Sequence, residues 1–156
     1  MPGYYPAQIC LNGHVISTCE NNVETYCSDC GAKTISACPN CNTPIRGDYN
    51  DEYIVYNDEY KRPSYCFACG NPFPWTQSSL KSIQELIDFD KQLSEEEKSY
   101  IDNNISALAT DTPRTKVVAT KLNVFLKKAG TVTVSAVRDI LVDIASETAK
   151  KIIFDE

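Results

Sequence analysis

The chain has 156 residues, of which 42% are hydrophobic, and a formal net charge of −6. This length suits one domain or two small ones, and the hydrophobic content is ordinary for a globular protein. The acidic balance disfavours general nucleic-acid binding, because an acidic protein repels a polyanion at long range.

The sequence predicts neither a secretory signal nor a membrane span. Its first residues lack a basic region and a long apolar stretch, and no segment approaches the roughly 20 apolar residues of a transmembrane helix. We therefore expect a cytoplasmic protein without membrane contact.

All eight cysteines lie within the first 69 residues. Six of them form three C-x-x-C pairs, a spacing that suits metal coordination better than a disulfide framework. After Trp75 the composition changes from Tyr, Asn, Pro, Gly and Cys to Lys, Glu, Leu, Ile and Ala. This shift predicts two domains, residues 1–76 and 77–156.

The N-terminal domain contains few large aliphatic residues, so burial alone would hardly offset the entropy of ordering it. Extended stretches at residues 14–17, 23–26 and 53–56 predict short strands between metal-binding turns. We therefore expect a fold that depends on bound metal.

The first group of candidate metal ligands begins with Cys10-Leu-Asn-Gly-His14 and continues with Cys27-Ser-Asp-Cys30-Gly. Three thiolates and one imidazole suit a structural zinc ion, and the glycines at 13 and 31 suit the tight turns of zinc knuckles. The predicted ligands are Cys10, His14, Cys27 and Cys30. Cys19 is either a replacement for His14 or an ordinary thiol, and we favour the thiol.

The second group begins with Cys38-Pro-Asn-Cys41 and ends with Cys66-Phe-Ala-Cys69, with a predicted hairpin at 43–65 between them. The predicted ligands are Cys38, Cys41, Cys66 and Cys69. The chain should thus hold two zinc ions, although thiolates would also accept iron at the second site. We favour sequential pairing because only short loops must close, whereas a RING-like cross-brace would join alternate pairs.

These motifs resemble those of known bacterial proteins. Cys10-x-Asn-Gly-His14 with a later Cys27-x-x-Cys30-Gly-Ala resembles bacterial zinc ribbons. The full layout, with Cys66-x-x-Cys69-Gly-x-Pro-x-Pro-Trp and a helical tail, resembles a bacterial tandem zinc-ribbon family filed as a domain of unknown function. The resemblance implies the ribbon fold and the metal, but no activity.

In the C-terminal domain, apolar residues spaced three or four apart predict four helices. The first follows the apolar stripe from Leu80 to Leu93. The second begins at Ser94, which forms a capping box with Glu97, and ends near Leu108.

The third helix lies between Thr112-Pro113 and Gly130, and the fourth extends from a cap at Thr133 or Ser135 to residue 153. Five basic residues lie on the third helix: Arg114, Lys116, Lys121, Lys127 and Lys128. Solvated or paired cations are commoner than a site for an anionic partner, so we expect the former here.

The predicted fold class is α+β: tandem zinc ribbons, built from short antiparallel hairpins with zinc knuckles, followed by a four-helix region. Four protein ligands per site leave no position for a catalytic water, and no other catalytic motif is present, so we expect no enzymatic activity.

We interpret the protein as a non-catalytic zinc-binding interaction or scaffold module of an intracellular bacterial complex. Its partner would be another protein or a second copy. Most aromatic residues of the N-terminal domain should fill its thin core, and some should form a partner-binding surface. Two alternatives remain open: nucleic-acid binding through the basic helix 113–129, and a RING-like transfer factor.

Overall fold

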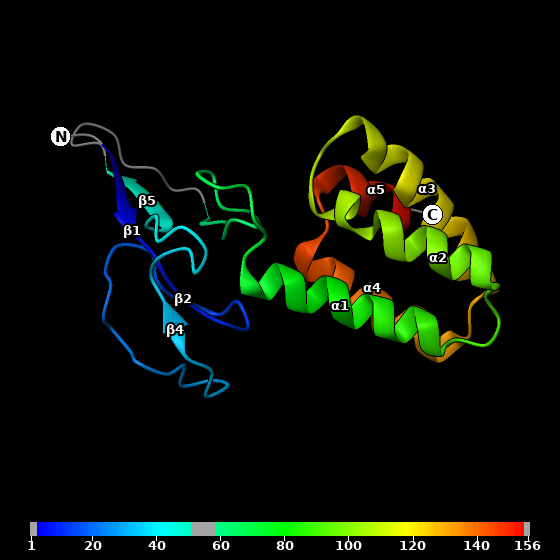
Figure 1. Cartoon of the computed structure of the whole chain (residues 1–156), viewed down its shortest axis with the longest axis horizontal. Coiled ribbons are helices and arrows are strands. Elements are labelled where there is room, and N and C mark those ends of the chain that lie inside the picture. Colours follow the sequence, from blue (N-terminus) through cyan, green and yellow to red (C-terminus); the bar gives the residue numbers. More distant parts are fainter. Residues whose placement is uncertain (1–2, 51–58, 155–156) are drawn as a thin grey trace. The chain divides into compact units, whose positions relative to one another are not determined.

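The computed structural model describes residues 3–50 and 59–154. The chain forms two compact units, Met1–Gln77 and Ser78–Glu156. Figure 1 shows the strands in the first unit and the bundled helices in the second. The predicted α+β class is confirmed.

The described part of the first unit contains five short strands: β1 (Gly3–Pro6), β2 (Gln8–Cys10), β3 (Val15–Ser17), β4 (Thr34–Ile35) and β5 (Arg46–Asn50). They make a three-stranded sheet in the order β3-β2-β4 and a two-stranded sheet of β1 and β5, both antiparallel. The small core beneath them consists of Ala7, Ile9, Cys38, Ile45, Cys66, Phe73 and Trp75. Two predicted metal ligands are therefore part of this core.

The strand predictions are partly correct. Strand β3 lies in the expected 14–17 stretch, but residues 23–26 form no strand. Their backbone is instead held by the buried Gln8 side chain: Val23 N donates to its Oε1 at 2.8 Å, and its Nε2 donates to Glu24 O at 2.6 Å. Strand β5, within the predicted 43–65 hairpin, pairs with β1. The expected strand at 53–56 lies outside the described residues.

Trp75 belongs to the core of the first unit although it lies in the first turn of helix α1 (Pro74–Phe89). It is 2% exposed, its ring stacks on Phe73 at 4.8 Å between centroids, and its Nε1 donates to Pro63 O at 2.9 Å. The helix that begins in the first unit thus contributes a large aromatic side chain to it.

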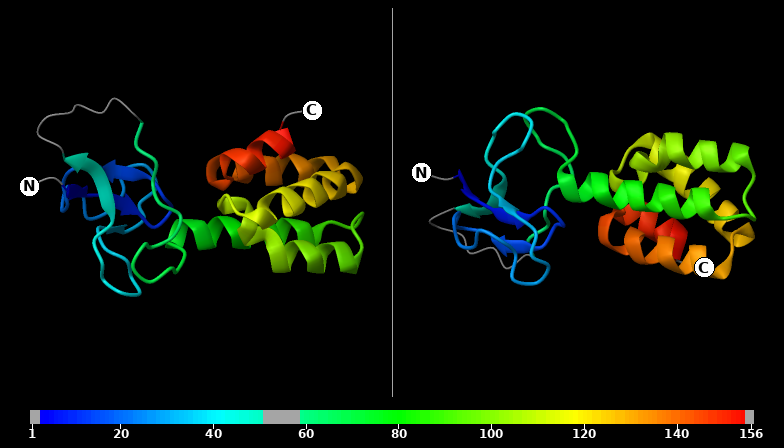
Figure 2. Two further views of the ribbon diagram at one scale, coloured as in Figure 1. Left: turned by 90° about the horizontal axis from the view of Figure 1, so that it is seen from above. Right: turned by 60° about the horizontal axis from the view of Figure 1, so that its bottom comes forward.

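Helices form the second unit. They are α1, α2 (Glu95–Asn104), a 3-10 helix (Ile105–Ala109), α3 (Pro113–Lys128), α4 (Thr131–Ile144) and α5 (Glu147–Phe154). Helix α3 packs against α2, the 3-10 helix and α5. Figure 2 shows the bundled helices from two further directions. One core of Ile, Leu, Val and Ala residues from every helix fills the space between them. Among the described residues, no helix is long and apolar enough to cross a membrane.

Two predicted helix starts are confirmed. Ser94 caps α2: Glu97 N donates to Ser94 Oγ at 3.1 Å, and Ser94 N donates to Glu97 Oε1 at 3.0 Å. Thr112 precedes Pro113, the first residue of α3. Local signals decide both boundaries, because cap and helix are adjacent in the sequence.

The third helix ends just before Gly130, as predicted, but other helix boundaries differ from the prediction. The structure has five α-helices where four were expected, because the last predicted helix is divided at Ala145 and Ser146. Ala145 is extended, Ser146 N donates to Leu108 O at 2.8 Å, and Ser146 Oγ accepts from Ala149 N. The second predicted helix also ends early, at Asn104, where the 3-10 helix continues the chain.

The expected cap of the last helix at Thr133 or Ser135 is wrong. Helix α4 begins at Thr131, and its cap residue is Gly130. The acceptor for Gly130 N is the carboxylate of Asp90, at 2.9 Å. Since Asp90 lies 40 residues away in the chain, no local pattern could indicate this cap.

Candidate metal centres

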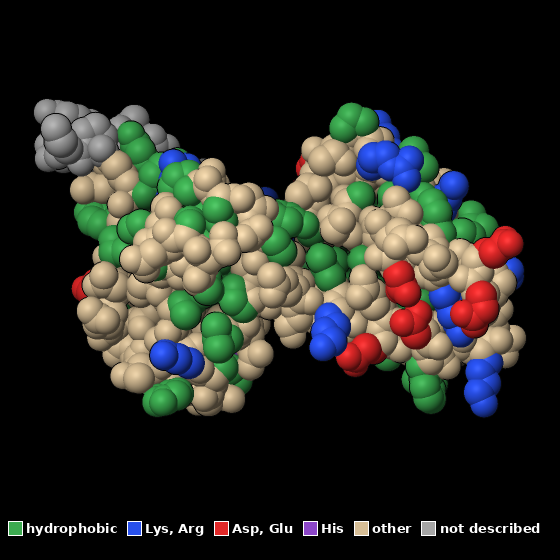
Figure 3. All heavy atoms as spheres, viewed as in Figure 1, with side chains coloured by type: hydrophobic (Ala, Val, Ile, Leu, Met, Phe, Trp, Pro, Cys, Tyr) green, Lys and Arg blue, Asp and Glu red, His purple; other side chains and the backbone are tan. Residues whose placement is uncertain are grey.

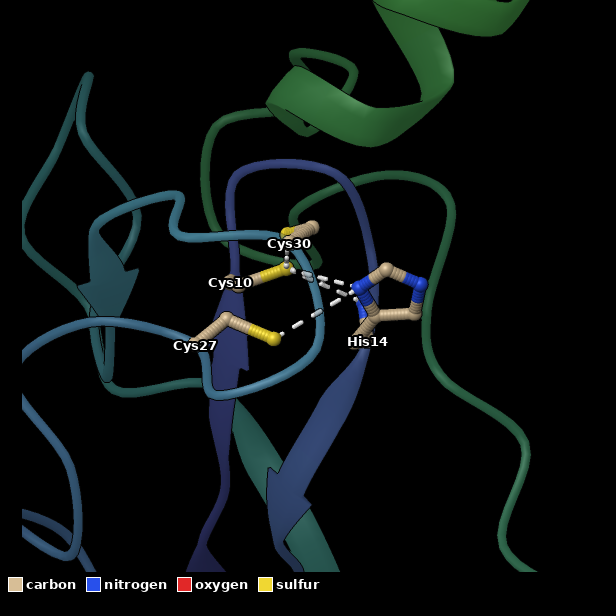
Figure 4. A group of neighbouring side chains, drawn as sticks. All are labelled: Cys10, His14, Cys27 and Cys30. Carbon is tan, nitrogen blue, oxygen red and sulfur yellow. Dashed lines mark hydrogen bonds between the residues drawn. The ribbon is translucent and has the colours of Figure 1, made fainter.

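The first cluster brings together Cys10, His14, Cys27 and Cys30. Cys10 ends β2, His14 immediately precedes β3, and the cysteine pair lies in the turn before β4. All four donor atoms lie within 4.8 Å of one another. Figure 4 shows the His14 ring turned toward the sulfurs, with Nδ1 3.4 Å from Cys10 Sγ and 3.6 Å from Cys27 Sγ.

The second cluster consists of Cys38, Cys41, Cys66 and Cys69, again with all donor atoms within 4.8 Å. Cys38 Sγ lies 3.7 Å from Cys69 Sγ, and Cys41 Sγ lies 3.6 Å from Cys66 Sγ. A tetrahedral ion with thiolates at about 2.3 Å would place the sulfurs about 3.8 Å apart. The separations therefore fit four-coordinate metal binding.

A single backbone pattern builds all three C-x-x-C turns. The amide of the first cysteine donates to a carbonyl five residues later: Cys27 to Ala32, Cys38 to Thr43 and Cys66 to Asn71, at 2.7 to 2.9 Å. The residue before each acceptor has a positive φ and donates back to the cysteine carbonyl. These residues are Gly31 (75°), Asn42 (63°) and Gly70 (76°). Each turn thus needs a residue that tolerates the left-handed region.

The fourth turn, around Cys10, is held by residues far apart in the sequence. Gly13 has φ of 93°, and its carbonyl accepts from Arg62 Nη1 at 2.7 Å. A Cβ at this position would lie 2.6 Å from Arg62 Nη1 and 2.9 Å from Trp75 Cβ. Gly13 is therefore required both by conformation and by close packing against Trp75.

Burial and hydrogen bonding shift the pKa values of the thiols in opposite directions. The first cysteine of each pair is buried, as is Cys10, and burial raises the pKa of Cys10 and of Cys38. The backbone of Ala32 and the side chain of Asn12 lower the pKa of Cys30 to about 6. The hydroxyl and then the backbone of Thr43 lower the pKa of Cys41 to about 6. Such hydrogen bonds favour the thiolate, which is the form that binds a metal.

The two clusters follow the sequential pairing of ligands. The first and second pairs meet in one cluster and the third and fourth in the other, so the RING-like cross-brace is not formed. Cys19 belongs to neither cluster: it is exposed, and its Sγ lies 3.9 Å from Ser17 Oγ. His14, not Cys19, completes the first cluster.

A family model described as "Uncharacterized protein conserved in bacteria (DUF2321)" matches residues 3–153. The chain belongs to the DUF2321 family. This confirms the resemblance to a bacterial domain of unknown function, and the match includes both cysteine clusters and the helical unit. Searches of the curated proteins and of the solved structures returned no significant match.

Several residues of this DUF2321 site were not found from the sequence. Asn42 has the positive φ that a glycine has in the other two C-x-x-C turns. Only its position directly after Cys38-x-x-Cys41 could have indicated this role. Asn12 Nδ2 donates to Cys30 Sγ at 3.3 Å, a role hidden within the C-x-N-G-H motif. The contributions of Gln8 and Arg62 have no local sequence signal, because their partners are distant in the chain.

Proposed function

We propose that the protein is a tandem zinc ribbon that binds two structural zinc ions and acts as a non-catalytic interaction module in a bacterial cytoplasmic complex. The observation that supports it best is the presence of two complete tetrads of donors, each with protein ligands for all four positions. A catalytic zinc ion keeps one position for water or substrate, whereas a structural ion is fully enclosed by protein ligands.

The donor types favour zinc. Three thiolates with one imidazole, and four thiolates, are common sets for structural zinc. The second tetrad is also chemically acceptable to iron. When bound, zinc supplies rigidity: it links the β2–β3 turn to the turn before β4, and in the second cluster it joins two turns whose first cysteines are part of the core.

The basic helix favours nucleic-acid binding less than its charge suggests. Three of its cations already contact α2: Lys128 Nζ lies 2.8 Å from Glu97 Oε1, Lys121 Nζ lies 4.5 Å from the Tyr100 centroid, and Arg114 donates to Asn104. These contacts support the solvated or paired role of the cations. The sequential ligand order likewise gives a RING-like transfer factor no support.

Metal analysis of the purified full chain tests the proposal. We expect close to two zinc ions per chain in the wild type, close to one in Cys69→Ser, and two in the control variant Cys19→Ser. One zinc ion or less in the reconstituted wild type would refute the two-site proposal. An equal loss of zinc in Cys69→Ser and in Cys19→Ser would show that the ligands are wrongly assigned.

The interaction role needs a second measurement. Partners captured from the native bacterium by the wild type should be lost with Cys69→Ser and should persist at moderate salt. Binding that disappears steeply with salt, and also with Lys127→Glu, would favour the nucleic-acid alternative instead.

A further inference from the structure

The surface of the first unit contains a groove with a volume of about 430 Å³. Tyr4, Tyr5, Pro6, Pro44, Arg46 and Phe67 line it, and we call it the aromatic groove. Tyr4 is 53% exposed and Phe67 is 58% exposed, although large aromatic side chains are often buried in a protein core. Exposed Tyr, Phe and Arg side chains around a groove are typical of binding surfaces.

Arg46 is held between two rings of the aromatic groove. Its guanidinium carbon lies 4.6 Å from the Tyr4 centroid and 3.7 Å from the Phe67 centroid. Within the described residues, no acceptor forms a hydrogen bond or ion pair with the guanidinium. The rings thus orient the group, and its edge donors have no partner among residues 3–50 and 59–154; this planar fork matches a carboxylate.

A second hollow, of about 130 Å³, adjoins the aromatic groove. Pro44, Arg46 and Phe67 line both hollows, while Pro63 and Tyr65 line only the smaller one. Arg46 is therefore in the wall that the two hollows share. A ligand that reaches both must carry apolar groups on either side of the group that meets Arg46.

We propose that the aromatic groove binds an extended segment of a partner protein with the pattern apolar-x-(Asp or Glu)-x-apolar. In an extended chain, alternate side chains point to one face at intervals of about 7 Å. The acidic side chain pairs with Arg46, and the apolar side chains occupy the two hollows. This inference names the partner class of the interaction module and rests on that proposed function.

Charge favours a peptide over a nucleic acid. Residues 1–77 contain four basic and eight acidic residues, a net charge of −4. Among the residues coloured by type in Figure 3, few charged side chains lie over this unit on the face shown, whereas they are frequent over the helices. A single carboxylate flanked by apolar residues suits one isolated cation, whereas a polyphosphate chain would be repelled.

An array of short synthetic peptides with this pattern, and a matched array with Gln in place of the acid, tests the inference on the metal-loaded full chain. We expect the acidic peptides to bind the wild type about tenfold more tightly than their Gln counterparts. Arg46→Gln should remove this difference, and Lys33→Gln, which removes a cation elsewhere on the same unit, should preserve it. Phe67→Ala should weaken both arrays.

Metal content and Trp75 fluorescence show whether each variant is folded. If no acidic peptide binds more tightly than its Gln counterpart to a chain with two bound zinc ions, the inference is overturned and the zinc module is left intact. Unchanged affinity in Arg46→Gln would also overturn it. Preferential binding of a short oligothymidylate, lost in Arg46→Gln, would assign the groove to single-stranded nucleic acid instead.

Discussion

The Asp90 carboxylate joins two distant parts of the helical unit, and substitution of Asp90 tests how much these hydrogen bonds stabilise that unit. The residue is 5% exposed. Its Oδ1 accepts from Gln92 N at 2.7 Å and Leu93 N at 3.2 Å, and its Oδ2 accepts from Gly130 N at 2.9 Å. The carboxylate therefore holds the turn after α1 and caps α4 at the same time.

Asp90→Asn keeps the size of the side chain but replaces one acceptor oxygen by a donor. The NH₂ group of the Asn side chain then faces a backbone N–H donor, so either the Gly130 amide or the Gln92 amide loses its acceptor. An unsatisfied buried donor costs about 1–3 kcal/mol, and loss of a helix cap costs a similar amount. We expect the free energy of unfolding to fall by about 2 kcal/mol at pH 7.

The effect should depend on pH in a defined direction. Burial raises the pKa of Asp90, but hydrogen bonds from Thr133, Gly130, Gln92 and Leu93 outweigh it and hold the pKa below its ordinary value. A lowered pKa stabilises the folded state above the unfolded-state pKa of about 4, and this stabilisation is lost as pH falls through the folded-state pKa. The difference between wild type and Asp90→Asn should therefore shrink below about pH 4.

Urea unfolding of the full chain, followed by circular dichroism at the helical minima, measures this change. For a unit of this size the midpoint should fall by about 1–2 M. Asp88→Asn is the matched control, because Asp88 is exposed near the same end of α1. Burial, and then the Asp88 carboxylate, raise the pKa of Asp102, so neutralising Asp88 should not destabilise the helical unit. Equal stability of Asp90→Asn and Asp88→Asn at pH 7 would refute the capping role.

Two further predictions concern the first unit. A strong chelator should expose Trp75 and shift its fluorescence to the red, while the helical circular dichroism signal persists. The helical signal should persist because only the helical unit has a broad aliphatic core. Simultaneous loss of both signals would mean that the two units unfold as one cooperative unit. Gly47→Ala should destabilise the first unit by more than about 2 kcal/mol, because its Cβ would collide with the Thr18 carbonyl oxygen. Gly3→Ala, with no atom within 4 Å of the added carbon, should be neutral in the same unfolding assay, and equal behaviour of the two variants would contradict the proposed packing.

Features that depend on neighbouring residues could be predicted from the sequence alone. Ligand types and spacing indicated both donor sets, since each C-x-x-C turn closes within six residues through its own backbone hydrogen bonds. Apolar periodicity indicated the helices, and Ser94 with Glu97 indicated the start of α2.

Other features depend on residues that are far apart in the chain and meet only in the folded protein. Asp90 sets the start of α4, and the Leu108 carbonyl holds Ser146 where a continuous helix was expected. Arg46 meets Tyr4 because β5 pairs with β1, a pairing that no local pattern specifies. In each case a polar or charged side chain or amide contacts the partner that the fold brings to it, so that partner is fixed only when the distant segments have packed.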